Sequence, residues 1–120
     1  IVAAMCRELE SPSFHPRPGG AHYLVPTYNE RAADFDPDRY WRGPVWLNTN
    51  WLLWHGLRQH GRISLANEVV ASSIELVRRS GFREYFDPLD GSGHGSDRFS
   101  WSAALFIDLV LSGHDVPDSG

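Results

Sequence analysis

Apolar residues recur at helical spacing in four stretches of the chain, which predicts four helices. We expect these helices over residues 1–9, 46–60, 64–80 and 100–111. The second stretch carries apolar residues on almost every side, so we expect it to lie between neighbouring elements. The alternation of apolar and polar residues that marks a strand is nearly absent. The pattern therefore predicts an all-α fold.

Turn-forming and capping residues indicate the ends of these helices. Ser64 suits the N-cap of the third predicted helix, and Gly81 suits its C-terminal end. Gly61 would end the preceding helix, and Gly113 would end the last one. We expect residues 114–120, which follow it, to form a disordered tail.

Two long segments between the predicted helices are rich in proline and glycine and should be loops. They cover residues 11–45, with a short extended stretch over residues 21–28, and residues 82–99. Loops longer than about 12 residues in a compact domain are usually functional or disordered. Both segments carry aromatic and charged residues, which favours a functional role.

The first loop ends in an aromatic motif with the sequence Tyr-Trp-Arg-Gly-Pro-Val-Trp, residues 40–46. Flat rings stack on the C–H faces of sugars, and arginine binds hydroxyl groups by hydrogen bonds. The candidate sugar-binding residues are Tyr40, Trp41, Arg42, Gly43 and Trp46. Composition leaves open whether these rings bind a ligand or belong to the core. Within the helix that follows, two tryptophans are expected to be core residues, Trp51 and Trp54.

The second loop begins with Glu84 among aromatic residues, an arrangement in which a carboxylate can serve as an acid or a base. The plainer interpretation is an ordinary carboxylate paired with Arg42 or Arg83, and residue types alone favour it. Further along, Asp87 precedes a proline and Asp90 precedes a glycine, so both are predicted to form turns.

The glycine run over residues 91–95 contains one histidine, His94. No second histidine or cysteine lies at ligand spacing from it, so no metal site is predicted. The run also lacks the Lys-Ser/Thr of a phosphate-binding loop and does not follow a predicted strand. We therefore expect no nucleotide cofactor.

Composition excludes several other classes of function. The 120 residues suit one domain, and a net charge of -4 offers no basic patch for nucleic acid or an anionic membrane. No apolar run approaches the roughly 20 residues needed to span a bilayer. A single cysteine, Cys6, cannot form an internal disulfide. No repeat of fixed period, which a solenoid requires, is present.

The two loop motifs, in this order and joined by a helix pair of fitting length, resemble those of glycoside hydrolase family 63. The likeness is greatest to its bacterial mannosylglycerate and glucosylglycerate hydrolases and covers residues 40–110. It implies an (α/α)6 toroid, the six-hairpin glycosidase fold, with the active site in loops at the mouth of a funnel. Since 120 residues supply about four or five helices, residues 1–120 would be a carboxyl-terminal fragment of one catalytic domain. The matching segments are Tyr40–Trp51, Glu84–Pro88, Gly91–Gly95 and Phe99–Trp101.

The resemblance also implies roles for individual residues. Glu84 matches the general base, which activates water on the face opposite the leaving group. The family's general acid is an aspartate upstream of the matched part, so we expect residues 1–120 alone to be inactive. Residues matching the aromatic walls of the sugar subsite are Tyr40, Trp41 and Trp46. Further positions counted as substrate-binding are Arg42, Gly43, His94 and Trp101.

The implied activity is inverting hydrolysis of a small α-glycoside, such as glucosylglycerate or mannosylglycerate, without a cofactor or metal. Two alternatives stay open: a family 63 α-glucosidase acting on oligosaccharides, and a non-catalytic helical carbohydrate-binding module. We expect a cytoplasmic protein whose partner is a small glycoside and not a nucleic acid or a membrane. The sequence does not predict the oligomeric state.

Overall fold

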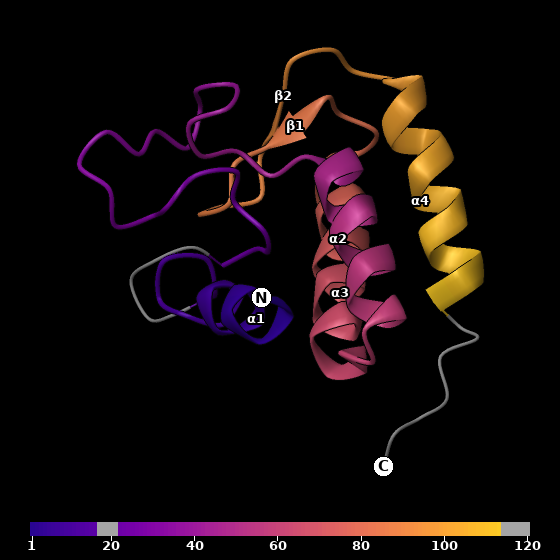
Figure 1. Ribbon diagram of the computed structural model, residues 1–120. Helices are drawn as coiled ribbons and strands as arrows, with labels where there is room; N and C mark the ends of the chain where they lie inside the picture. The colour runs from indigo at the N-terminus through magenta and orange to yellow at the C-terminus, as the bar shows by residue number, and fades with distance from the viewer. Residues whose placement is uncertain (17–21, 114–120) are drawn as a thin grey trace.

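The computed structural model describes residues 1–16 and 22–113, and these form a mainly helical chain (Figure 1). All the predicted helices are present, which confirms the all-α assignment. The tail predicted over residues 114–120 lies outside the described residues. The helices are α1 (Val2–Leu9), α2 (Leu47–Gln59), α3 (Ile63–Ser80) and α4 (Ser100–Gly113); the short strands are β1 (Tyr85–Phe86) and β2 (Gly93–His94).

The helices α2 and α3 pack side by side, with α1 and α4 on either side of the pair (Figure 1). Their main core contains the fully buried Trp54 of α2, Val69 of α3 and Leu109 of α4. The prediction that α2 lies between neighbours is therefore confirmed, although Leu52 remains 63% exposed. None of the helices in the described part combines the length and hydrophobicity needed to cross a bilayer.

The predicted N-cap of α3 is wrong. The helix begins at Ile63, its N-cap is Arg62, and no side chain caps it. Gly61 takes φ +72 and turns the chain so tightly that the Arg62 N–H bonds to the Leu57 carbonyl of α2. Ser64 thus falls inside the first turn. The other end agrees with expectation, because Gly81 follows Ser80 with φ +81 and ends the helix.

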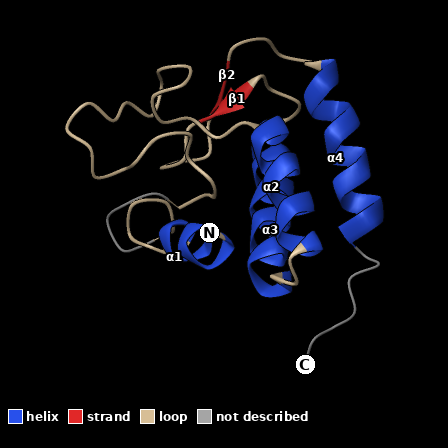
Figure 2. Cartoon of the chain, in the orientation of Figure 1, coloured by secondary structure: helices blue, strands red, loops and turns tan. Residues whose placement is uncertain are grey.

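A small antiparallel hairpin, which the sequence did not indicate, shapes the second long loop (Figure 2). Tyr85 pairs with His94, and Phe86 with Gly93. Phe86 also exchanges two backbone hydrogen bonds with Val45, at N–O distances of 2.8 and 2.9 Å. Each paired segment is far shorter than the four to eight residues in which alternation can be recognised. This pairing joins the two long loops where α2 and α4 begin.

Candidate active site

Four rings from both loops form a ring stack, which we define as Trp41, Trp46, Tyr85 and His94. Successive centroids lie 4.3, 5.2 and 5.8 Å apart, and successive planes differ by 10°, 19° and 20°. Trp46 is 3% exposed, whereas Trp41 is 49% exposed at one end of the stack. Within the stack Trp46 is therefore buried, and Trp41 offers an accessible face at its end.

Tyr40 lies edge-on to the ring stack and connects it to Glu84. Its ring meets those of Trp46 and Tyr85 at interplanar angles of 82° and 79°. Its carbonyl accepts a hydrogen bond of 2.7 Å from the Trp46 indole N–H. The backbone takes φ +30, a rare value for a residue other than glycine and one that often marks functional positions.

The carboxylate of Glu84 is held at both of its oxygens. The Tyr40 hydroxyl donates to Oε1 at 3.2 Å, and the Ser96 backbone N–H donates to Oε2 at 3.1 Å. Desolvation and the hydrogen bond to Glu84 raise the pKa of Tyr40, so its hydroxyl keeps its proton and remains a donor. The plain interpretation of Glu84 as the ion-pair partner of an arginine is not what the structure shows.

The two arginines in question have other neighbours among the described residues. The Arg83 guanidinium donates to the Gly95 carbonyl at 3.2 Å. Arg42 lies close enough to Tyr28 to lower the pKa of that phenol, against the larger rise caused by the hydrogen bond to Asp34. Gly43 is buried, and a Cβ there would collide with the backbone of Asp36.

The glycine run permits the close approach of Glu84. Gly95 takes φ +70, and a Cβ at this position would lie 2.5 Å from Glu84 Oε2. A Cβ on Gly93 would overlap the side chain of Arg83. Both loop positions therefore require glycine for the second loop to fold around the carboxylate.

A narrow crevice lies beside Glu84, and in this structure it is too tight to admit a water molecule. At its edge Trp101, the last predicted aromatic, is 52% exposed. Asn48 also lines the crevice, and its buried side-chain Oδ1 has no hydrogen-bond partner among the described residues. The lining residues are Trp46, Leu47, Asn48, Glu84, Phe99, Trp101, Ser102 and Leu105.

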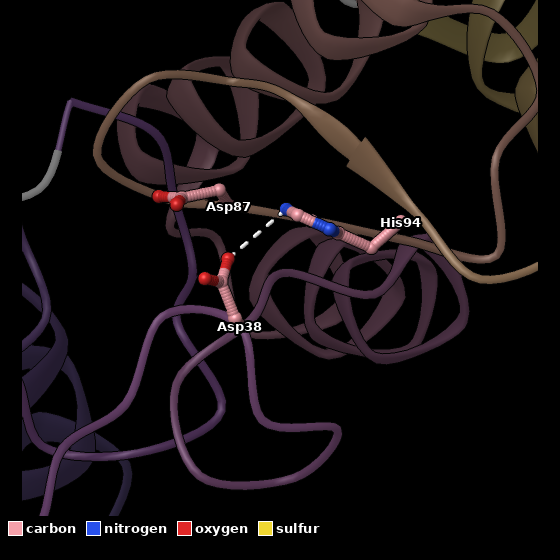
Figure 3. Close-up of side chains that lie close together, drawn as sticks. All are labelled: Asp38, Asp87 and His94. Carbon is pink, nitrogen blue, oxygen red and sulfur yellow. Dashed lines mark ion pairs between the residues drawn. The ribbon is translucent and has the colours of Figure 1, made fainter.

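At the end of the ring stack opposite Trp41, His94 lies beside two carboxylates (Figure 3). Its Nε2 lies 3.1 Å from Asp38 Oδ1, and Asp87 is close by. The predicted turn roles are confirmed, because Asp87 Oδ1 accepts from the Leu89 N–H at 2.7 Å and Asp90 Oδ1 from the Ser92 N–H at 2.8 Å. Burial raises the pKa of Asp87, which the Leu89 hydrogen bond partly opposes.

Sequence reasoning missed Tyr85, Ser96 and Asn48 as members of this site. Tyr85 and Asn48 lie inside the two motifs, beside residues that were selected, so adjacency was the available signal. Ser96 acts through its backbone N–H, which no residue type reveals.

Comparison with known proteins assigns the chain to a family. Residues 1–102 match the model of the mannosylglycerate hydrolase MGH1-like glycoside hydrolase domain, and the chain belongs to this family. It is 48% identical over 110 residues to a mannosylglycerate hydrolase of Rubrobacter radiotolerans, covering 92% of this chain and 25% of that protein. It is 32% identical over 107 residues to a glucosylglycerate hydrolase of Mycolicibacterium hassiacum, covering 89% and 24%.

The fold comparison agrees. A crystal structure of the family 63 mannosylglycerate hydrolase of Thermus thermophilus, in complex with Tris and D-glycerate, superposes with a TM-score of 0.72 at 48% identity. The match covers 77% of this chain and 22% of that one. The described helices are therefore part of an (α/α)6 toroid, as the resemblance implied. The chain spans about a quarter of the length of the relatives it matches.

Proposed function

We propose that the intact protein is an inverting glycoside hydrolase of glucosylglycerate or mannosylglycerate, with Glu84 as its general base. The observation that carries the proposal is the Glu84 carboxylate held between the Tyr40 hydroxyl and the Ser96 N–H, beside the crevice. The names of the similar hydrolases, and the glycerate bound to the Thermus relative, support this substrate class.

In this mechanism Glu84 takes a proton from water as the water oxygen attacks the anomeric carbon. The glycosidic C–O bond breaks on the opposite face, and a second carboxylic acid protonates the departing glycerate oxygen. Inverting enzymes place the two carboxyl groups roughly 6.5–9.5 Å apart. We assign the acid to a part of the protein beyond residues 1–120, so these residues alone should give no turnover.

Two exposed side chains near Glu84 are suited to bind the sugar. The exposed faces of Trp41 and Trp101 can stack on C–H groups.

The decisive experiment replaces Glu84 by Gln in the intact protein. We expect kcat on both glycerate glycosides to fall by about 10²–10⁴-fold with substrate Kd retained, because the base is lost and the shape is kept. Glu75→Gln is the matched control, since Glu75 lies on α3 and pairs with Arg78. Unchanged activity in Glu84→Gln would exclude the general-base role and favour a non-catalytic module.

Two further measurements test the stereochemistry and the substrate. Proton NMR early in the reaction should show the β-anomer of the released sugar, and an initial α-anomer would exclude inversion. Turnover of glucosylglycerate and mannosylglycerate should exceed that of α-glucosyl oligosaccharides. The reverse order would favour the oligosaccharide α-glucosidase.

A further inference from the structure

Asp38, Asp87 and His94 bring three potential metal ligands together from the two loops (Figure 3). One ligand atom of each lies within 4.8 Å of those of the others. An imidazole with two carboxylates is a donor set suited to Zn²⁺, Co²⁺ or Mn²⁺, whereas Ca²⁺ and Mg²⁺ prefer oxygen ligands alone. We propose that these three residues bind a divalent transition metal ion of the Zn²⁺ class.

The cluster has free ligand capacity where such an ion would sit. Asp87 is 8% exposed, and its Oδ1 accepts the hydrogen bonds that form the turn. Within the described part of the chain, no hydrogen bond reaches its Oδ2. This oxygen is not among the fully buried unpartnered atoms, so it is open to solvent and available as a ligand to a cation.

The geometry needs little change to close around an ion. Zn–N and Zn–O distances of about 2.0–2.2 Å in a tetrahedral site place ligand atoms roughly 3.4 Å apart. His94 Nε2 and Asp38 Oδ1 are already 3.1 Å apart, and the Asp38 side chain is 66% exposed and free to rotate. The Ser92 hydroxyl, 3.2 Å from the same nitrogen, can accept a hydrogen bond from a water on the open fourth position.

A metal ion here would hold the two loops in position and would take no part in the chemical step. Asp38 precedes Tyr40 by two residues, and His94 adjoins Gly95, which touches Glu84. The ion would therefore fix the aromatic loop to the loop that carries Glu84. Binding of the ion does not depend on the proposed hydrolase activity.

The test measures binding of Zn²⁺ and Co²⁺ to the intact protein after EDTA treatment and dialysis, by calorimetry and by the visible absorption of Co²⁺. We expect one equivalent, and a loss of affinity of at least tenfold in His94→Gln and in Asp38→Asn. His55→Gln is the matched control, because His55 lies 3.9 Å from a single carboxylate, that of Asp108. It should bind like the natural protein.

A second readout guards against misfolding of the variants. In EDTA the natural protein, His94→Gln and Asp38→Asn should unfold within a few degrees of one another, since both changed side chains lie at least partly in solvent and their contacts with each other are exposed. Added Zn²⁺ should raise the midpoint of the natural protein alone. Absence of stoichiometric binding, binding by both ligand variants as tight as that of the natural protein, or a preference for Ca²⁺ over Zn²⁺ would overturn the proposal.

Discussion

The α2–α3 helix pair and the two loops that meet at Glu84 are held in place by different forces. In the pair, buried apolar side chains such as Trp54, Val69 and Leu76 supply many small contacts. In the loops, single atoms hold the carboxylate of Glu84: the Tyr40 hydroxyl and the Ser96 N–H. We therefore expect changes in the helix pair to alter stability, and changes in the loops to alter the geometry of the site.

The largest effect expected in the helix pair follows from Trp54→Ala. Trp54 is 1% exposed, so its truncation should lower the free energy of unfolding by about 3–5 kcal/mol. Activity per folded molecule should be retained. The matched substitution is Trp101→Ala at the crevice, where the ring is 52% exposed and stability should change by about 1 kcal/mol or less. Denaturant unfolding should show the stability loss in Trp54→Ala, and substrate binding should show the loss of affinity in Trp101→Ala. Each variant should leave the other quantity nearly unchanged.

Gly95→Ala tests the contact between the second loop and the carboxylate of Glu84. The new Cβ would lie 2.5 Å from Glu84 Oε2 and displace the carboxylate, so kcat should fall by about 100-fold. Gly61→Ala is the control, because its φ of +72 matches the +70 of Gly95 while its surroundings are open. Both should lose about 1–2 kcal/mol of stability from backbone strain. Equal activities in the two variants would contradict the contact with Glu84.

Asn50 crosses the boundary between the two regions, since this buried residue of α2 bonds to the first loop. Its Oδ1 accepts from the Val25 N–H at 3.1 Å, and its Nδ2 donates to the Leu24 carbonyl at 2.9 Å. Asn50→Ala would leave the Val25 N–H unpaired, whereas the Leu24 carbonyl would keep its hydrogen bond from the Ser72 hydroxyl, and the change should cost about 1–3 kcal/mol of stability. Asn67→Ala, on the exposed face of α3, should cost far less. Thermal unfolding of both variants would measure the difference.

The same contrast explains what could be predicted from the sequence. Apolar spacing is a local property, so it located α2, α3 and α4, and positive φ at Gly61 and Gly81 agreed with their predicted roles. The predicted start of α3 was wrong because the helix begins after the hydrogen bond from the Arg62 N–H to the Leu57 carbonyl, and not at a Ser64 cap.

The site was predictable only where a motif singled out a residue. Glu84 and Tyr40 were selected in this way, whereas Tyr85, Ser96 and Asn48 were not. The ring stack and the cluster at His94 join residues 38–46 to residues 85–94, and no periodicity reports such a contact. Asp38 could not be paired with His94 by spacing, since 56 residues separate them.

The smallest predicted effect, Tyr40→Phe, is also the most specific. It removes one hydroxyl, keeps the ring edge-on to Trp46, and changes no buried volume. A hydrogen bond contributes about 0.5–1.5 kcal/mol, so kcat/KM should fall by about 2- to 10-fold. Tyr28→Phe is the control, because its hydroxyl bonds to Asp34 in the same loop and not to Glu84. If both variants lose activity equally, the hydroxyls serve the loop as a whole; a loss confined to Tyr40→Phe means that one atom orients the base.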